Sequence, residues 1–286
     1  MNTEWEWVEG PAGYRMPVAT LDGKHDGPTW VFAAAVHGDE YEGPEAIRRA
    51  IAELSDLDFR GRVIALPVAN PMAYRAGTRC TPDDGGNLNR HFPGTADGSL
   101  TARWADWLWN EFIRHGNRLI DLHAGGQTWE FEALAGFYHP DDAPFAAAFG
   151  FPLWQVPEQR GVLSREFRQR IGPAIGCELG FGGGRNEQHV VQTHSALVRL
   201  ARGETGASAE KPYCCTNIVA AQDGEWITSC TLGQTVGEGD LLGSIWDWTG
   251  HLVEELRSPC AGRVITMRKL ISVQADGLLV TVGSRD

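Results

Sequence analysis

Several absences narrow the class of protein to which this sequence can belong. No run rich in lysine or arginine occurs, and 37 acidic side chains outnumber 25 basic ones to give a formal net charge of −12, which argues against a nucleic-acid-binding surface. The longest apolar stretch falls far short of the ~20 residues that a membrane-spanning helix needs. The first seven residues are acidic and lack the basic start and apolar core of an export signal. We therefore expect a cytoplasmic protein without nucleic-acid or membrane partners.

Cysteine pairs with the spacing of a metal cluster are also missing. The six cysteines lie at positions 80, 177, 214, 215, 230 and 260, and no Cys-x-x-Cys occurs among them. In a reducing cytoplasm such residues stay as thiols, and we interpret them as small buried side chains.

The 286 residues, of which 42% are hydrophobic, suffice for one large core or two domains. Over the first ~205 residues strand-like and helix-like segments alternate, as in α/β proteins. We predict strands at 30–36, 62–68, 118–122, 133–138 and 173–178, and helices near 43–54, 100–114 and 187–202. Further along, short β-rich runs are broken by glycine-containing turns at roughly ten-residue intervals. We therefore predict an α/β domain over residues 1–208 and a small all-β domain over residues 209–286.

Two histidines stand where predicted strands end. His37 begins the segment His-Gly-Asp-Glu directly after the apolar run 30–36, and His123 follows the apolar run 119–122. Strand ends are the usual place for ligands in an open α/β sheet. Residues three apart share one face of a helix, so we expect His37 and Glu40 to lie together on a first helical turn. Two imidazoles and one carboxylate form a ligand set for a catalytic zinc with a fourth position open to water.

Four motifs in one order carry a family resemblance. They are HGDEYEGPE at 37–45, NPMAY…GTR…NLNRHFPG between 70 and 94, DLHAGG at 121–126 and ELGFGGG at 178–184. Over about residues 28–200 the chain resembles the succinylglutamate desuccinylase/aspartoacylase family, a branch of the zinc carboxypeptidase clan. The glycine run after Glu178 is similar to that of diaminobutyrate-deacetylase-like members. The β-rich end resembles the barrel-sandwich tail of bacterial N-acyl-amino-acid deacylases. The fold that this implies is a zinc-exopeptidase-like mixed sheet flanked by helices, followed by a small all-β barrel-sandwich-like domain.

The resemblance also implies roles for particular residues. One Zn²⁺ per chain would be held by three side chains, His37, Glu40 and His123. The catalytic residues would be Glu178, as the proton-transferring base, and Arg79, which would polarise the scissile carbonyl. The substrate's carboxylate would be held by Asn89 and Arg90, and a loop arginine offers the planar fork that suits this task.

Two further residues are singled out by position alone. Tyr138 ends a predicted strand and is a candidate contact for the leaving group. Asp121 lies two residues before His123, so both side chains point the same way from a strand. It is either a partner of the metal ligands or substrate, or a buried structural acid.

The function implied by the resemblance is zinc-dependent hydrolysis of a linear amide C–N bond. The substrate would be a small N-acyl amino acid or related carboxylate, cleaved to a carboxylic acid and a free amine. The alternatives are a zinc carboxypeptidase acting on short peptides and a non-catalytic binding protein of the same fold. The β domain would cover the site, or would join copies of the chain as a homo-oligomer.

Overall fold

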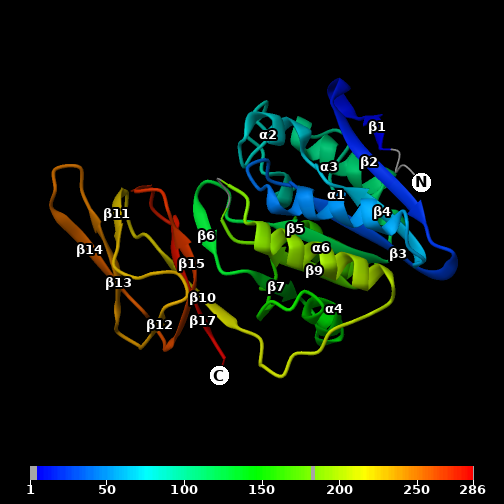
Figure 1. Cartoon of the computed structure of the whole chain (residues 1–286). Coiled ribbons are helices and arrows are strands. Elements are labelled where there is room, and N and C mark those ends of the chain that lie inside the picture. The colour runs from blue at the N-terminus through cyan, green and yellow to red at the C-terminus, as the bar shows by residue number, and fades with distance from the viewer. Residues whose placement is uncertain (1–4, 182–183, 286) are drawn as a thin grey trace.

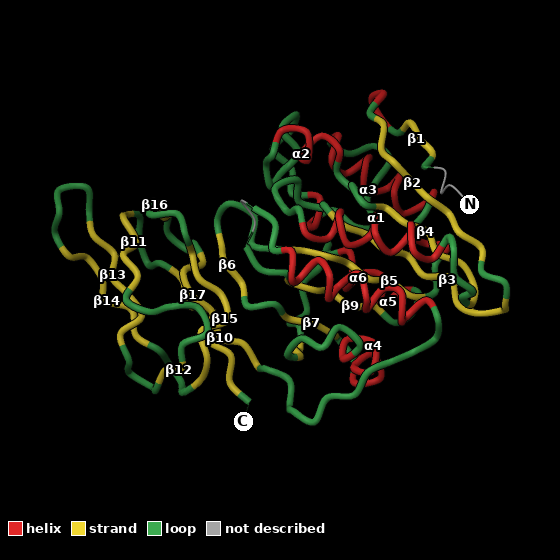
Figure 2. Tube along the Cα trace, in the orientation of Figure 1, coloured by secondary structure: helices red, strands yellow, loops and turns green. Residues whose placement is uncertain are grey.

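A mixed eight-stranded sheet forms the centre of the protein, which is described here from a computed structural model covering residues 5–181 and 184–285 (Figures 1 and 2). Its strand order is β1-β2-β4-β3-β5-β9-β7-β8. In chain order the strands are β1 (Glu6–Glu9), β2 (Arg15–Asp22), β3 (His25–Ala34), β4 (Arg60–Leu66), β5 (Arg118–His123), β7 (Leu134–Phe137), β8 (Leu153–Gln155) and β9 (Ala174–Glu178). The central strands β4, β3, β5 and β9 are parallel. The carboxyl ends of β3, β5 and β9 therefore meet at one edge, where α/β sheets place their ligands.

Helices cover both faces of this sheet. They are α1 (Glu42–Leu54), α2 (Pro71–Ala76), α3 (Leu100–Glu111), α4 (Ala143–Ala147), α5 (Leu163–Arg170) and α6 (Glu187–Ala201). Short 3₁₀ turns occupy Pro11–Gly13, Leu88–Arg90, Ile113–His115 and Pro140–Asp142.

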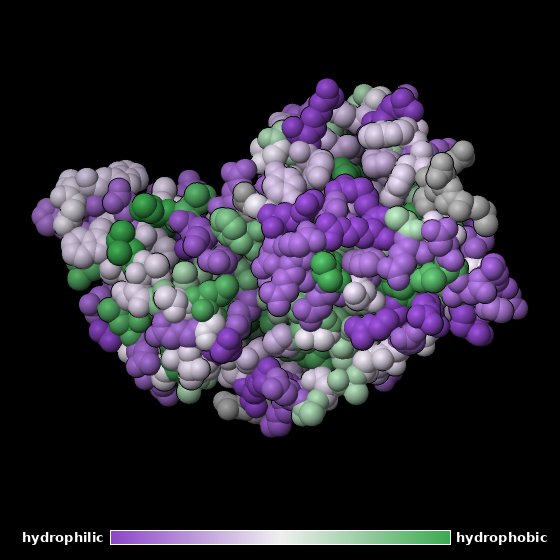
Figure 3. Space-filling view, viewed as in Figure 1, coloured by the Kyte–Doolittle hydropathy of each residue, from purple (hydrophilic) through white to green (hydrophobic). Residues whose placement is uncertain are grey.

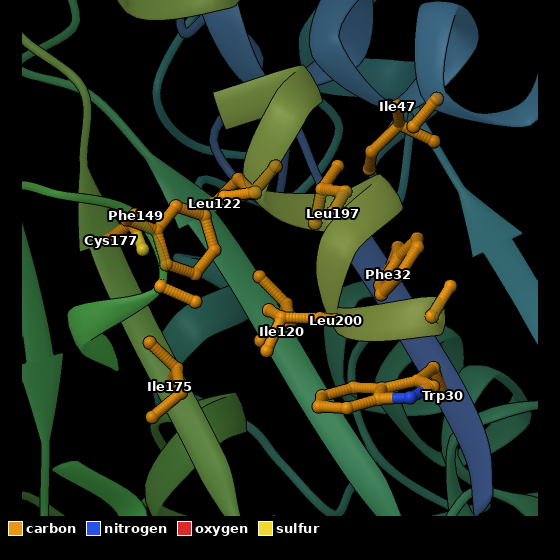
Figure 4. Packing of buried hydrophobic residues seen from close by; sticks show 14 of the residues in the cluster. Trp30, Phe32, Ile47, Ile120, Leu122, Phe149, Ile175, Cys177, Leu197 and Leu200 are labelled. Carbon is orange, nitrogen blue, oxygen red and sulfur yellow. The ribbon is translucent and has the colours of Figure 1, made fainter. Parts of the chain in front are cut away.

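Strand β3 shows how the two cores are separated. Trp30 and Phe32 pack with α1 and α6 on one face, where Ile47, Leu197 and Leu200 belong to the cluster drawn in Figure 4. Val31 and Ala33 pack on the other face, against α3 and α5. This alternation follows from the two-residue period of a strand, and burial on both faces explains the unbroken apolar run. The outer surface is mostly hydrophilic where α1 and α6 face the viewer in Figure 3.

The C-terminal part is entirely β. Two antiparallel sheets pack around a separate core that includes Trp226, Leu242, Ile245 and Val280. One sheet has the order β10-β17-β15-β12 and the other β14-β13-β11-β16. These strands are β10 (Cys214–Val219), β11 (Gly224–Thr228), β12 (Thr235–Val236), β13 (Leu241–Trp246), β14 (Leu252–Arg257), β15 (Gly262–Arg268), β16 (Ser272–Val273) and β17 (Leu278–Ser284). A short strand from the first part, β6 (Trp129–Phe131), pairs with β15.

The predicted fold class is confirmed: a mixed sheet flanked by helices precedes an all-β region. Strand β3 ends at Ala34, before the predicted 36, and α3 ends at Glu111 because the chain tightens into a 3₁₀ turn. Strands β1, β2, β6 and β8 lay outside every predicted strand. The pairing of β6 with β15 crosses the proposed domain boundary, which stays a prediction.

Candidate metal centre and active-site pocket

Three buried side chains converge at the carboxyl edge of the sheet. His37 and Glu40 come from the segment between β3 and α1, and His123 is the last residue of β5. Glu40 Oε1 lies 2.8 Å from His37 Nδ1, and Glu40 Oε2 lies 3.0 Å from His123 Nδ1. One ligand atom from each of the three residues lies within 4.8 Å of those of the others. This grouping of two imidazoles and a carboxylate suits a single divalent metal such as zinc.

The far nitrogen of each imidazole has a partner of its own. His37 Nε2 lies 3.2 Å from Asn87 Oδ1, and His123 Nε2 lies 3.1 Å from Asp121 Oδ1. Metal-ligating histidines commonly have a carboxylate or carbonyl on the second nitrogen, which fixes the ring and its tautomer. Both rings therefore turn Nδ1 toward Glu40, so that the three candidate ligand groups face one another.

The surroundings of the two imidazoles shift their pKa values in opposite directions. Burial lowers the pKa of His37. Burial also acts to lower the pKa of His123, but the carboxylates of Asp121 and Glu40 outweigh it and raise that pKa well above its ordinary value. The two imidazoles in turn hold the pKa of Glu40 well below its usual range despite its burial. Glu40 is thus an anion at neutral pH, as a metal ligand must be.

The segment that carries His37 and Glu40 is a turn rather than a helix. The expected helical turn is wrong, because α1 begins only at Glu42. Asn70 holds the segment by donating from Nδ2 to the Val36 carbonyl over 3.4 Å, and the Gly38 amide donates to the Thr78 carbonyl over 2.9 Å. A Cβ on Gly38 would lie 1.9 Å from the carbonyl carbon of Ala73, so the close approach of these two backbones requires glycine.

Glu178 lies beside His123. The two residues end the neighbouring parallel strands β5 and β9 and are directly paired in register. Glu178 lines the same pocket, and its Oε2 is buried with no hydrogen-bond partner among the described residues. Burial raises the pKa of Glu178 to about 8; His123 opposes this shift and the charge of Glu40 adds to it. Two of the three glycines that follow, Gly182 and Gly183, lie outside the described residues.

The other predicted site residues line the same pocket. Arg79 Nη1 donates to Glu40 Oε1 over 3.3 Å. Arg90 lines the cavity while staying exposed to solvent, and partial desolvation together with the charge of Arg79 lowers its pKa. Asn89 is buried, accepting from the Leu163 amide over 2.8 Å and placing Nδ2 3.3 Å from His123 Nε2. The structure therefore brings both predicted arginines to one cavity with the three candidate ligands.

Tyr138 also lines this cavity, just beyond the end of β7. Its hydroxyl lies 3.2 Å from Ser164 Oγ, and burial raises the pKa of the phenol. Tyr138 is thus a neutral hydrogen-bonding group at neutral pH, available at the cavity wall.

The cavity has a volume of about 360 Å³ and is walled from two sides. The α/β part contributes the residues above and a set of apolar side chains. The C-terminal sheet contributes Cys215, Asn217, Ile265, Thr266, Leu278 and Thr281. Large and mostly apolar walls around a few convergent polar groups are typical of a small-molecule site.

Two contributors to the site were not anticipated from the sequence. Asn87 belongs to a quoted motif, but nothing local indicates that its side chain faces His37, fifty residues away in the chain. Trp129 lines the cavity with Arg79 5.1 Å above its ring. A single tryptophan after a glycine-containing loop gives no sequence signal of this role.

Comparison with known proteins identifies this arrangement. The sequence model of the succinylglutamate desuccinylase/aspartoacylase catalytic domain matches residues 26–203. The chain belongs to this family. The resemblance expected from the four motifs is thereby confirmed, and the matched residues include both histidines, Glu40 and Glu178.

The proteins to which this chain is similar align with most of its length. It is 30% identical over 270 residues to N-alpha-acetyl-L-2,4-diaminobutyric acid deacetylase of Halomonas elongata, covering 87% of this chain and 78% of the relative. The product-bound ectoine utilization protein EutE (DoeB) of Ruegeria pomeroyi superposes with a TM-score of 0.84 at 26% identity, over 98% of this chain and 94% of the other. A Rhodobacter sphaeroides succinylglutamate desuccinylase/aspartoacylase shares the fold, with a TM-score of 0.85 at 22% identity over 99% and 95% of the two chains.

The family and the deacetylase relative are named for deacylases of the hydrolase class, which act on small acyl amino acids. Among the described residues, no helix combines the length and the apolar character needed to span a bilayer.

Proposed function

We propose that the protein is a zinc-dependent amidohydrolase that cleaves a small N-acyl amino acid into a carboxylic acid and a free amine. The observation that carries this proposal is that His37, Glu40 and His123 meet Glu178 in one pocket. One carboxyl oxygen of Glu178 is buried there without a hydrogen-bond partner in the part of the chain that the structure describes. A binding protein has no need of a carboxyl group held beside three metal ligands.

His37, Glu40 and His123 would hold the zinc. When bound there, zinc lowers the pKa of a coordinated water from ~15.7 toward ~7 and polarises the substrate carbonyl. The donor set and the outer contacts to Asn87 and Asp121 fit this ion.

Glu178 would move the proton. A carboxyl group whose pKa lies near neutrality can accept a proton from water and return it to the leaving amine nitrogen, and burial raises the pKa of Glu178 to about 8. Its alignment with His123 places it beside the ligand set. Tyr138, neutral at the cavity wall, would contact the leaving group.

The two arginines would each interact with a different negative group of the substrate. Arg79 lies 3.3 Å from Glu40 and so is next to the ligand set, where it would stabilise the oxyanion that forms on the carbonyl. Arg90 lies on the loop that follows and would hold the substrate's carboxylate, supported by Asn89.

The C-terminal β region would act as a cover. Its side chains wall the cavity opposite the candidate ligands, which favours a free amino-acid derivative over a long peptide. Its core is separate from the two cores of the first part, which supports the proposed division into domains at 1–208 and 209–286.

A mass-spectrometric screen tests the proposal. Zinc-loaded protein would be incubated with a panel of N-acyl amino acids, including N-acetyl-2,4-diaminobutyrate, and with short peptides, while Glu178→Gln serves as the inactive reference. We expect release of acid and amine from at least one N-acyl amino acid. Release of C-terminal residues from the peptides alone would show a carboxypeptidase, and no release from any compound would refute the proposal.

A further inference from the structure

Trp129 occupies a position between the active-site arginine and the C-terminal β region. It is the first residue of β6, lines the cavity, and places its ring 5.1 Å from the guanidinium carbon of Arg79. A guanidinium over an indole face is attracted by the ring's quadrupole, and tryptophan is the strongest partner for this contact.

Trp129 is fixed from the C-terminal side. Its indole N–H donates to the Leu278 carbonyl of β17 over 3.2 Å, and the residue pairs with Arg268 of β15. The bond to Leu278 joins residues 149 positions apart. The ring therefore cannot leave Arg79 without breaking contacts with the β region.

Trp129 is also held by the segment that follows the candidate ligand His123. Its amide donates to the Gly125 carbonyl over 2.9 Å, and Gly125 lies two residues after His123. A Cβ on Gly125 would lie 1.9 Å from the Trp129 carbonyl oxygen, so glycine is needed for the turn that brings the ring back over the site.

Arg79 needs such a support. Among the described residues, Arg79 forms an ion pair with Glu40 over 3.3 Å. Glu40 also contacts both histidines. A carboxylate that serves as a metal ligand has little freedom to orient a neighbouring guanidinium. The Trp129 ring is a restraint on Arg79 that does not depend on Glu40.

We propose that Trp129 is a positioning residue: its ring holds the Arg79 guanidinium at the reaction centre, and its bond to Leu278 ties that position to the C-terminal β region. This inference rests on the proposed function, in which Arg79 stabilises the oxyanion. Trp129 itself touches no reacting atom. A displacement of about 1 Å in a catalytic group can lower a rate ~10²-fold, so the effect should fall on kcat.

A double-mutant cycle isolates the effect that passes through Arg79. Trp129→Leu removes the ring, Trp129→Phe keeps a ring face but loses the indole N–H, and Trp248→Leu, at a side chain that is 77% exposed, is the matched control. We expect Trp129→Leu to lower kcat about 10- to 100-fold with KM little changed. Trp129→Phe, which keeps a ring face but loses the bond to Leu278, should have a kcat between those of Trp129→Leu and the wild type, and Trp248→Leu should leave kcat unaltered. In an Arg79→Ala background, Trp129→Leu should change kcat less than about threefold.

Multiplying losses in kcat from Trp129→Leu and Arg79→Ala would overturn the positioning role, as would a kcat for Trp129→Phe no higher than that for Trp129→Leu. A wild-type kcat for Trp129→Phe would contradict the part assigned to the bond with Leu278. The four proteins of the cycle are the wild type, Trp129→Leu, Arg79→Ala and the double variant. Freed of metal, they should also show non-additive shifts in the midpoint of urea unfolding. Additive shifts would show that the contact between Trp129 and Arg79 is absent in solution. If the midpoints are non-additive but the zinc-loaded wild type hydrolyses nothing in the panel, the proposed function fails and the role assigned to Trp129 in it fails as well.

Discussion

His123 and Glu178 are paired residues at the ends of two adjacent parallel strands, β5 and β9. The β-sheet itself thus sets the separation between a candidate metal ligand and the candidate base. Sites built on strands are held more firmly than sites on loops.

Replacing Glu178 with glutamine should separate chemistry from binding. The amide has the shape of the carboxyl group but cannot accept the proton from water, so kcat should fall by at least about 100-fold. Metal content, measured by mass spectrometry of the purified protein, should match that of the wild type. Near-normal kcat in this variant would assign the base to another residue.

Replacing Arg90 with alanine should act on KM. Its carboxylate contact would be equal in the ground and transition states, so its loss raises KM by about 10-fold or more and leaves kcat nearly unchanged. Arg103→Ala, at an exposed position of α3, is the matched control. A fall in kcat at constant KM would instead place Arg90 at the reacting carbonyl.

Asp121→Asn should weaken metal binding without removing a ligand. Asp121 Oδ1 lies 3.1 Å from His123 Nε2, and losing such an outer partner typically costs 10- to 100-fold in affinity. Competition with a chelator of known zinc affinity measures the change. Unaltered affinity would leave Asp121 as a structural acid.

Much of this arrangement could be predicted from the sequence, and the reasons are physical. Strands β3, β4, β5 and β9 are largely buried on both faces, so they appear as apolar runs. His37 lies three residues after the end of β3, and His123 is the last residue of β5. The candidate metal ligands, both arginines and Glu178 were predicted from short motifs, in which residues close together in the chain lie at the same site.

The remainder depends on contacts between distant parts of the chain. Strands β6 and β8 have three residues each, too few to show a period. The bond from Trp129 to Leu278 spans 149 positions, and no local pattern encodes it. The Gly38 turn was misread as a helix because its conformation is imposed by Ala73, packed against it from α2.

Glu42 should make the metal-free protein less stable at high pH. Its side chain is fully buried. Among the described residues only Oε1 has a hydrogen-bond partner, the Asn186 amide at 3.2 Å. Burial raises the pKa of Glu42 to about 7. A carboxyl group whose folded-state pKa is raised is neutral in the fold while the unfolded chain ionises near 4.5. The stability that the neutral Glu42 carboxyl group contributes is therefore fully present below the unfolded pKa of 4.5 and is lost as the pH rises through about 7.

Glu42→Gln removes this dependence. The free energy of unfolding of the variant, minus that of the wild type, should rise by on the order of 2 kcal/mol between pH 5 and pH 8. Thermal unfolding in the presence of chelator measures it, with Glu238→Gln on an exposed turn as control. Parallel pH profiles for the wild type and Glu42→Gln would show that Glu42 is ionised in the fold.

Stepwise addition of zinc to metal-free protein, with amine release from an N-acyl amino acid as the signal, tests the central claim most directly. The account predicts that hydrolysis is absent at first, rises in proportion to added zinc and saturates at one equivalent per chain, and that His123→Ala shows no such rise. Hydrolysis at full rate in thoroughly chelated protein, or saturation that is the same in His123→Ala, would contradict it.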